Sequence, residues 1–480
     1  MRNREHNGGS GVLKSYDPAT CTLQLSMSDP QLQIRRIDAR RSNVDGLLGE
    51  LREKLSPRGD VVSERGRQKT IEVFGEPLTP SEVVQRICED VRTGGTEALL
   101  GYSRSLDGAT LTASTLRVPA AELASAHAQA DPRFLETIGR IRENIREFQS
   151  AILHRDVEIQ RPSGVRLGQR YLAVRRAGLC IPGGAAAYPS TVLMTAIPAQ
   201  VAGVEELAVV APPTQFGSYN SDLLATCHEL EIDEVYRVGG AQAVAALAFG
   251  VDGISAVDKI VGPGNLFVAL AKKYVYGEVD IDSIAGPSEV VVIADETTNP
   301  VHAAADLLAQ AEHAPGSSVL VTWSESTAES TAVELERQVR QLSRCELTVR
   351  SLQEFGAIIL VQDADQACEI TNQIGPEHLH IAVDNPDRLL GRIRNAGALF
   401  LGRFSPVAVG DYAAGPSHVL PTGGTSRWAS GLSANSFLRS SSVIAYTEQG
   451  LRDIAGDVQR LADKERLTAH RASVDIRVAE

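Results

Sequence analysis

A carboxylate and an imidazole stand side by side in Gly375-Pro376-Glu377-His378, just before a predicted strand. A strand end can direct both side chains into a cleft. There, two bases of different pKa suit proton abstraction and water activation. A solvated Glu-His turn would give the same pattern. The motif therefore indicates either a pair of catalytic bases or a surface turn, and His380, two residues further on, is interpreted as structural.

A possible metal site lies at Gln310-Ala311-Glu312-His313, at the end of a predicted helix that Asn299 caps and Pro300 opens. The spacing i, i+3 places Gln310 and His313 on one helix face, so both could reach one ion. Imidazole suits zinc, and an amide oxygen is a rarer ligand. The alternative is a C-terminal histidine that interacts with the helix dipole.

Three glycine-rich turns each follow a predicted strand and precede a predicted helix: Pro182-Gly183-Gly184, Gly239-Gly240 and Gly262-Pro263-Gly264-Asn265. Glycine lets backbone N–H groups approach a phosphate at a helix N-terminus. None of the turns matches G-x-G-x-x-G. Each alone is compatible with a simple tight turn. Together they indicate a nucleotide or anion site at the carboxyl ends of strands.

Two further places carry polar side chains of interest. Gly410-Asp411-Tyr412 and Ser417-His418 occupy a loop rich in Gly, Ala and Pro, which is a plausible site-forming segment. Glu465 and His470 lie five residues apart near the C-terminus. Without other information, the latter pair is expected at the surface.

The elements that must position these residues form two α/β series. Short β-branched runs alternate with helical stretches from about Tyr171, as in a parallel sheet wrapped by helices. Strands are predicted at 178–181, 207–210, 235–238, 258–261, 289–294, 318–322, 357–361, 379–383 and 398–401, with helices at 190–204, 241–249, 265–274 and 299–313. The fold class is therefore α/β: two doubly wound Rossmann-like domains with a cleft between them, an N-terminal helical region and a C-terminal helical tail.

The domain organisation follows from these patterns. We expect a partly disordered N-terminal extension (1–60), in which Met27 is an alternative start, and a helical region (61–177) that packs on the second α/β domain. One of its helices begins at the capping box Thr79–Glu82 and ends at Gly94-Gly95. The first α/β domain (178–286), the second (287–430) and a tail (431–480) follow. The tail has a short strand at 443–446 and one apolar helical stripe, which needs a surface to cover.

Composition narrows the class of protein. The 480 residues contain 47 Lys+Arg and 60 Asp+Glu, a net charge of −13, which argues against a nucleic-acid partner. No stretch approaches the ~20 apolar residues of a membrane span. Six dispersed cysteines and the absence of an apolar signal region favour a soluble, cytoplasmic protein in a reducing compartment.

Taken together, the motifs resemble one family. The blocks occur in the family's order from about residue 65 to the C-terminus: Pro182-Gly183-Gly184, Pro189-Ser190-Thr191-Val192-Leu193-Met194, Gly239-Gly240-Ala241-Gln242-Ala243, Gly262-Pro263-Gly264-Asn265, Ala285-Gly286-Pro287-Ser288-Glu289, Gln310-Ala311-Glu312-His313, Gly375-Pro376-Glu377-His378, Gly410-Asp411-Tyr412 and Leu467-Thr468-Ala469-His470. This set is similar to that of the histidinol dehydrogenases. So many motifs in order are highly specific, unlike any one of them.

The resemblance implies an NAD- and zinc-dependent oxidoreductase of histidine biosynthesis, which oxidises L-histidinol through L-histidinal to L-histidine. It implies zinc ligands Gln310, His313, Asp411 and His470, and catalytic bases Glu377 and His378. Ser288, His418 and Glu465 would join these residues in contacting substrate, and Gln242 and Asn265 would contact the NAD cofactor of the first α/β domain. It also implies a homodimer whose tail exchanges Glu465 and His470 into the partner's site.

One position departs from the family pattern. Cys180 stands two residues before Pro182-Gly183-Gly184, at a position where the family usually has an aromatic residue. Whether Tyr188 replaces the cofactor contact of that aromatic residue stays open. Two other functions stay open at this point. One is a related zinc and NAD dehydrogenase that acts on another small polyol, such as sulfopropanediol. The other is an inactive two-domain binding protein.

Overall fold

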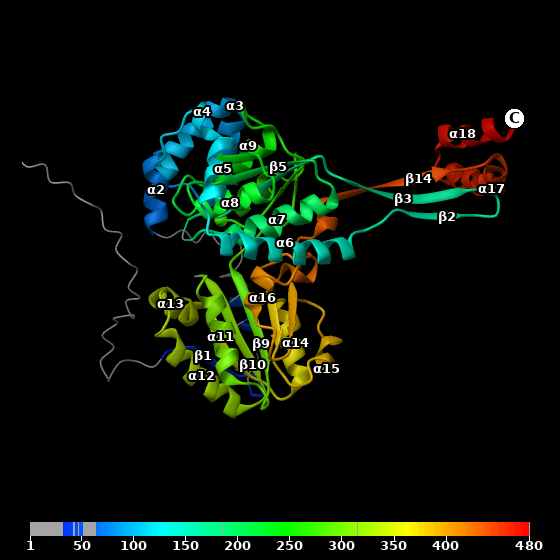
Figure 1. Ribbon diagram of the computed structural model, residues 1–480. Coiled ribbons are helices and arrows are strands. Elements are labelled where there is room, and N and C mark those ends of the chain that lie inside the picture. The colour runs from blue at the N-terminus through cyan, green and yellow to red at the C-terminus, as the bar shows by residue number, and fades with distance from the viewer. Residues whose placement is uncertain are drawn as a thin grey trace, which may run out of the picture. The chain divides into compact units, whose positions relative to one another are not determined.

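The chain divides into two compact units. The computed structural model describes residues 32–41, 44–46, 48–50, 64–184, 186–313 and 315–479. Unit 1 combines Met1–Arg52 with Pro287–Val407, and unit 2 combines Glu53–Gly286 with Ala408–Glu480 (Figure 1). Each unit contains its own parallel sheet.

Unit 2 holds a five-stranded sheet in the order β6-β5-β4-β7-β8, with every neighbouring pair parallel. Counted along the chain, this order is third, second, first, fourth, fifth, which is the doubly wound arrangement. The strands are β4 (Arg176–Cys180), β5 (Glu206–Ala211), β6 (Glu234–Arg237), β7 (Lys259–Val261) and β8 (Asp280–Ile281). Helices α7 (Pro189–Ala202), α8 (Ser221–Glu229), α9 (Gly240–Phe249) and α10 (Leu266–Val275) connect them.

Unit 1 repeats this arrangement with one added strand. Its order is β1-β11-β10-β9-β12-β13, again all parallel, with β1 (Arg35–Asp38) beside β11. The other strands are β9 (Ser288–Ala294), β10 (Gly316–Thr322), β11 (Gly356–Leu360), β12 (His378–Ile381) and β13 (Ala398–Leu401). The helices are α11 (Pro300–Ala311), α12 (Glu325–Val339), α13 (Cys345–Phe355), α14 (Ala364–Ile374) and the short α15 (Asp387–Leu390). The predicted fold class, two doubly wound α/β sheets, is confirmed.

The N-terminal extension (1–60) was predicted as a partly disordered segment apart from the two α/β domains. For strand β1 this prediction is wrong. The backbone of Arg35–Asp38 pairs with that of Ala357–Leu360, and Ala39 continues the pairing through a hydrogen bond to the Leu360 carbonyl (2.8 Å). The segment RRID has a single apolar residue, so its sequence carries no strand pattern. Residues 1–31, including Met27, lie outside the described residues.

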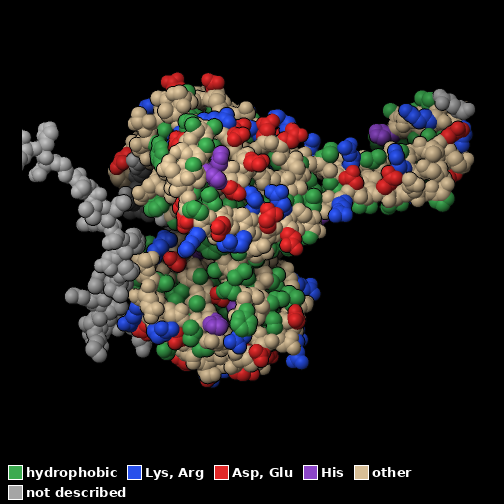
Figure 2. All heavy atoms as spheres, viewed as in Figure 1, with side chains coloured by type: hydrophobic (Ala, Val, Ile, Leu, Met, Phe, Trp, Pro, Cys, Tyr) green, Lys and Arg blue, Asp and Glu red, His purple; other side chains and the backbone are tan. Residues whose placement is uncertain are grey.

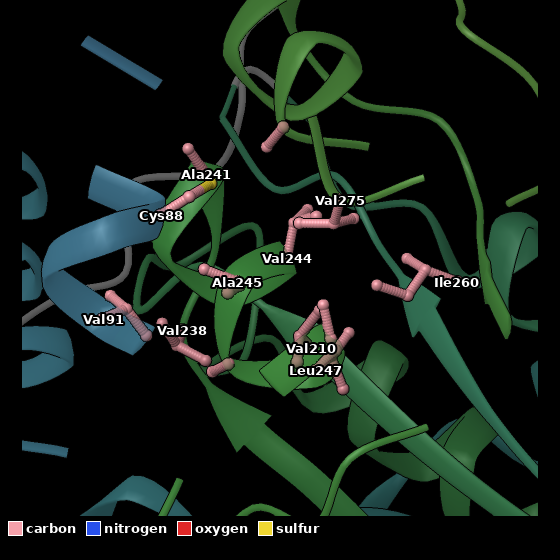
Figure 3. Close-up of a cluster of buried hydrophobic side chains, with 14 of the residues drawn as sticks. Cys88, Val91, Val210, Val238, Ala241, Val244, Ala245, Leu247, Ile260 and Val275 are labelled. Carbon is pink, nitrogen blue, oxygen red and sulfur yellow. The ribbon is translucent and has the colours of Figure 1, made fainter. Parts of the chain in front are cut away.

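The helical region packs on the first α/β domain, not on the second as predicted. It comprises α2 (Glu64–Phe74), α3 (Pro80–Asp107), α4 (Ala113–Leu116), α5 (Ala120–Gln129) and α6 (Pro132–Ile152), and all of it belongs to unit 2. Helix α3 lies against α9 and α10, α5 against α8, and α6 against α7. Cys88 and Val91 of α3 share one buried core with Val210, Val244 and Leu247 (Figure 3). An apolar stripe shows that a helix must be covered but does not identify the sheet that covers it.

Helix α3 begins as predicted and ends later. Thr79 Oγ1 accepts a hydrogen bond from the Glu82 N–H, and Glu82 accepts one from the Thr79 N–H (2.8 Å), which completes the capping box. The expected stop at Gly94-Gly95 is instead a kink. Gly95 leaves the helical conformation (φ +58°), and the helix resumes and continues to Asp107.

Residues after Val407 belong to unit 2, so the predicted extent of the second α/β domain (287–430) is too long. Helix α16 (Val407–Tyr412) spans the division. Ser417 Oγ then donates to the Met194 carbonyl (2.8 Å), and the Gly286 N–H donates to Thr422 Oγ1 (2.6 Å). These side-chain contacts tie a segment rich in Gly, Ala and Pro to α7 and to the residues that follow β8, which periodicity could not reveal.

A C-terminal module completes unit 2. Strands β2 (Val157–Gln160), β3 (Arg166–Ala173) and β14 (Leu438–Ala445) form an antiparallel sheet in the order β14-β3-β2. Helices α17 (Glu448–Lys464) and α18 (Thr468–Ala479) pack on each other. Ile159, Ile444, Leu461 and Ile476 are all more than half exposed, and Figure 2 shows hydrophobic side chains on the viewed face of this module. Much of its apolar surface is thus uncovered within the described chain.

No helix in the described parts of the chain is long and apolar enough to cross a membrane. The five cysteines among these residues are buried and form no disulfide with one another.

Candidate active site

Glu377 and His378 lie at the amino end of β12, inside unit 1. Both side chains are buried, at 5% and 4% exposure, so the prediction of a solvated turn does not apply to them. The His378 Nδ1 and Glu377 Oε2 atoms are 3.7 Å apart, and the His378 ring lies 5.9 Å from that of Phe400 on β13. The strand starts at His378 itself, one residue earlier than predicted. The structure therefore provides two adjacent bases in a largely dry environment.

The neighbouring strand β9 supports this pair. The backbone N–H of Glu289 donates to Glu377 Oε2 (3.2 Å), and His378 stands opposite Val290 in the β9–β12 register. Ser288, the first residue of β9, is half-buried, whereas the Glu289 side chain is buried. The sequence analysis gave Glu289 no role. The signal that could have identified it is a charged residue at the start of an otherwise apolar strand.

Gln310 and His313 lie at the carboxyl end of α11. Asn299 Oδ1 accepts from the Val301 N–H (2.9 Å) and caps the helix, which ends at Ala311, so His313 lies in a turn and not on the predicted helical face. Pro315 follows closely and prevents the helix from continuing. Gln310 is 3% exposed, and its amide nitrogen has no hydrogen-bond partner within the described residues. His313 is exposed.

A second imidazole joins α11 to β12. His380 Nδ1 lies 2.6 Å from Asp306 Oδ2, and its Nε2 lies 2.9 Å from the Gly402 carbonyl oxygen. Both side chains are buried, and Asp306 lies one helical turn before Gln310. The ring thus lies between a carboxylate and a backbone carbonyl oxygen. This agrees with the structural interpretation of His380, but its partner is 74 positions away in the sequence.

The two expected cofactor contacts share a cavity in unit 2. Gln242, at the start of α9, and Asn265, the N-cap of α10, line a cavity of about 230 Å³ together with Asp107 and Phe267. Gln242 Nε2 donates to Asp107 Oδ2 (3.1 Å), and desolvation raises the pKa of the Asp107 carboxyl to about 6. Asp107 as a whole residue is exposed, so solvent moderates the energetic effect of this shift. The sequence analysis did not single out Asp107.

The cavity lies where two of the predicted glycine-rich turns meet. Gly240 and Gln242 follow β6, and Asn265 follows β7, so one side of the lining comes from the carboxyl ends of strands, and helices α2 and α3 supply the other. Cys180, at the end of β4, is instead buried in the core, and burial raises the pKa of its thiol to about 12. It does not line the cavity. A deeply buried thiol of this kind is unreactive.

Asp411 and His418 are brought together within unit 2. The His418 Nδ1 atom lies 2.8 Å from the backbone carbonyl of Asp411, and its Nε2 lies 3.3 Å from Thr191 Oγ1. The loop thus fixes the imidazole against α7 and against the backbone of the expected metal ligand. If Nδ1 donates to the carbonyl, Nε2 is the atom that accepts from the Thr191 hydroxyl.

Glu465 and His470 belong to the C-terminal module and are exposed, as the surface interpretation expected. Glu465 is the C-cap of α17, and His470 lies in the first turn of α18. The expected site residues are therefore divided: Ser288, Gln310, His313, Glu377 and His378 lie in unit 1, and Gln242, Asn265, Asp411, His418, Glu465 and His470 lie in unit 2. Within the described ranges, no three His, Cys, Asp or Glu residues are grouped as a metal site.

Comparisons with known proteins now identify the family. The sequence model of the histidinol dehydrogenase family matches residues 77–478. A protein named histidinol dehydrogenase from Rhodopirellula baltica is 63% identical over 451 residues, which cover 93% of this chain and 98% of that relative. One from Heliobacterium mobile is 46% identical and covers 82% and 93%. Part of the first 60 residues thus has a counterpart in the first relative.

A solved structure agrees in three dimensions. The crystal structure of histidinol dehydrogenase from Elizabethkingia anophelis superposes with a TM-score of 0.83 at 32% identity, covering 93% of this chain and 98% of that one. The region matched by the family model includes every expected site residue and both parallel sheets except strand β1, which lies before residue 77. The chain belongs to the histidinol dehydrogenase family.

Proposed function

We propose that this oxidoreductase converts L-histidinol to L-histidine through L-histidinal, in two NAD-dependent oxidations, with zinc at the site. The observation that carries the proposal is the buried Glu377–His378 pair at the amino end of β12, in a chain 63% identical to a protein named histidinol dehydrogenase. The same identity favours this substrate over another small polyol such as sulfopropanediol. The two paired bases argue against an inactive binding protein.

NAD binding is supported by the cavity of unit 2. Gln242 and Asn265 line it at the carboxyl ends of β6 and β7, where doubly wound sheets bind nucleotides. Its volume of about 230 Å³ would hold one part of a dinucleotide. When bound, NAD supplies the hydride acceptor. The chain itself contributes amide groups from Gln242 and Asn265 that can hydrogen-bond to it.

The expected zinc donors fit the metal chemically. Two imidazoles, one carboxylate and one amide oxygen form a donor set that zinc accepts. The buried Gln310 amide nitrogen without a partner indicates that this side chain is not consumed by structural contacts. Gln310, His313, Asp411 and His470 would hold the ion. When bound, the ion would mainly orient the substrate through its amine and imidazole nitrogens, an entropic contribution rather than Lewis-acid work on the alcohol.

The two bases would then divide the proton transfers. In the first oxidation, His378 accepts the proton of the substrate hydroxyl while two electrons leave the adjacent carbon as hydride. In the second, Glu377 removes a proton from water as its oxygen attacks the aldehyde carbon, and the hydrate so formed loses hydride from that carbon and a proton from one hydroxyl to give the carboxylic acid. Their burial keeps competing water away and strengthens the electrostatic interactions in the site. The Glu289 N–H holds Glu377 Oε2 and so helps to fix the orientation of the carboxylate.

The C-terminal module supports a homodimer. Glu465 and His470 are exposed there beside apolar residues such as Leu461, which is 64% exposed. We propose that this surface contacts a partner subunit and completes the partner's site. Mixing an inactive His470→Ala protein with an inactive His378→Ala protein should restore part of the activity, since one site of the heterodimer is intact. No recovery after proven subunit exchange would contradict the arrangement.

The decisive experiment is NADH formation from L-histidinol by the purified full chain. We expect two NADH per histidinol, and loss of turnover with a chelator that added zinc reverses. NADH formation from sulfopropanediol but not from histidinol would favour the polyol alternative. Binding of histidinol without any turnover in the zinc-loaded protein would favour the inactive binding protein.

A further inference from the structure

An ion pair that the mechanism does not use contacts the turn that carries Asn265. Lys272 on α10 and Asp282 after β8 form a salt bridge, and their side chains are 2% and 4% exposed. We propose that this pair is a positioning device that fixes the turn Gly262-Pro263-Gly264-Asn265 and thereby presents Asn265 to bound NAD. The inference rests on the proposed NAD-dependent function.

The pair holds both backbone groups of one residue. The Gly262 N–H donates to Asp282 Oδ2 (2.7 Å), and Lys272 Nζ donates to the Gly262 carbonyl oxygen (3.0 Å). Hydrogen bonds with a charged partner are shorter and stronger than neutral ones. Gly262 is the first residue after β7, so the two side chains set the direction in which the chain leaves the sheet.

The turn has little room to adopt another shape. Gly262 has φ +110°, a conformation that L side chains rarely adopt, and an added Cβ would lie 2.3 Å from the Cys180 carbonyl oxygen. The residue is therefore enclosed between the end of β4 on one side and the ion pair on the other. A change in the ion pair should be transmitted directly to the turn, because the turn cannot relax toward β4.

The constraint on the turn also fixes the position of Asn265, the last residue of the turn and the N-cap of α10. Its Oδ1 accepts from the Val268 N–H (3.1 Å) and caps α10, so its amide nitrogen is the group left to donate to a ligand in the cavity. Lys272 belongs to the same helix. Helix α10 is thus fixed to the turn at its N-cap by Asn265 and, about two turns later, by Lys272.

Stability alone does not explain a buried pair at this place. Apolar residues of similar volume often replace a buried ion pair without loss of stability, whereas removal of one partner leaves a buried charge. Apolar residues could not form the two hydrogen bonds that hold the N–H and the carbonyl of Gly262. The chain offers a control in Lys259–Asp280 of the same sheet, a lysine–aspartate pair whose lysine is buried and whose aspartate is 53% exposed. There Lys259 Nζ contacts Asp280 (2.5 Å) and the Ile281 carbonyl (3.1 Å) but no residue of the turn.

The test uses the full chain with both charges removed, Lys272→Met/Asp282→Leu, and the control Lys259→Met/Asp280→Leu. Calorimetric titration gives the Kd of NAD, steady-state kinetics give KM and kcat, and thermal unfolding gives Tm. We expect a folded variant whose Kd and KM for NAD rise roughly tenfold to a hundredfold, with kcat at saturating NAD changed far less. The control variant should bind NAD as the wild type does.

The outcomes separate this inference from the proposed function. Wild-type protein that neither binds NAD nor forms NADH overturns both. A working wild type, with a folded double variant that binds NAD normally, overturns the inference alone, as does a lowered Tm without a change in Kd. If the double variant does not fold, Lys272→Met/Asp282→Asn keeps an acceptor for the Gly262 N–H and is judged by the same criteria.

Discussion

Replacement of Glu377 by glutamine separates the two oxidation steps. The side chain is 5% exposed and accepts one hydrogen bond from the Glu289 N–H at 3.2 Å. Glutamine has nearly the same shape, and its carbonyl oxygen can accept that bond, so the fold should persist. The change removes the carboxylate that would take a proton from water and leaves His378 in place.

The size of the effect follows from this geometry. A positioned general base contributes about 10²- to 10⁴-fold to a rate, which corresponds to roughly 3–5 kcal/mol of barrier height. We expect the oxidation of L-histidinal to slow by about that factor, whereas the oxidation of L-histidinol, which uses His378, slows by less than about tenfold. The free energy of unfolding should fall by only about 1 kcal/mol, since one hydrogen bond is weakened and none is lost.

The assay supplies L-histidinol and L-histidinal in separate single-turnover experiments and follows NADH, so product release does not mask chemistry. Glu289→Gln is a suitable control, because it removes another buried carboxylate of equal exposure one strand away. It should not slow the aldehyde step selectively. Equal losses in both steps for Glu377→Gln would refute the division of labour between the two bases.

Three other predictions concern stability and reactivity. His380→Leu leaves Asp306 buried without its partner and should lower the free energy of unfolding by about 3–5 kcal/mol in denaturant titrations, and Asp306→Leu/His380→Leu should recover most of it. An equally large loss in the double variant would contradict this. The pKa of Asp107 is raised to about 6, so its folding contribution is fully present only below the unfolded pKa, near 4, and is lost as pH rises through 6. Thermal scans of Asp107→Asn should therefore show a larger stabilisation, or a smaller loss, at about pH 8 than at about pH 4, and the reverse order would count against the shift. Burial and a pKa raised to about 12 should protect Cys180 from alkylation in the native protein, and peptide mapping after labelling would reveal any early modification.

Sequence patterns were sufficient for the strands of the two sheets except β1 and the two-residue β8. Strands buried on both faces read as short apolar runs bounded by glycine-rich turns, so β9 was predicted at 289–294 and is observed at Ser288–Ala294. The caps of α3 and α11 were equally visible, since Thr79 and Asn299 act on residues two or three positions away. Local chemistry predicts local structure well.

What sequence patterns could not provide is the pairing of distant segments. The apolar face of α3 gave no indication that it covers α9, and Asp306 gave no sign of His380, 74 residues later. The sequence left open whether Glu377 and His378 are catalytic bases or a surface turn. The choice depends on whether their side chains are buried, which only the packed structure shows. Asp107 was missed because one carboxylate at the end of a helix is ordinary until Gln242 is found against it.

Strand β1 bears on how far the N-terminus can be shortened. A protein that begins at Met27 still contains Arg35–Asp38, whereas one reduced to the residues that match the family, from 77 onward, does not. Loss of β1 would leave the backbone groups of β11 unpaired along one side, and an open strand of this kind recruits strands from other molecules. The shorter protein should aggregate during expression although every proposed catalytic residue is present, and the longer one should not.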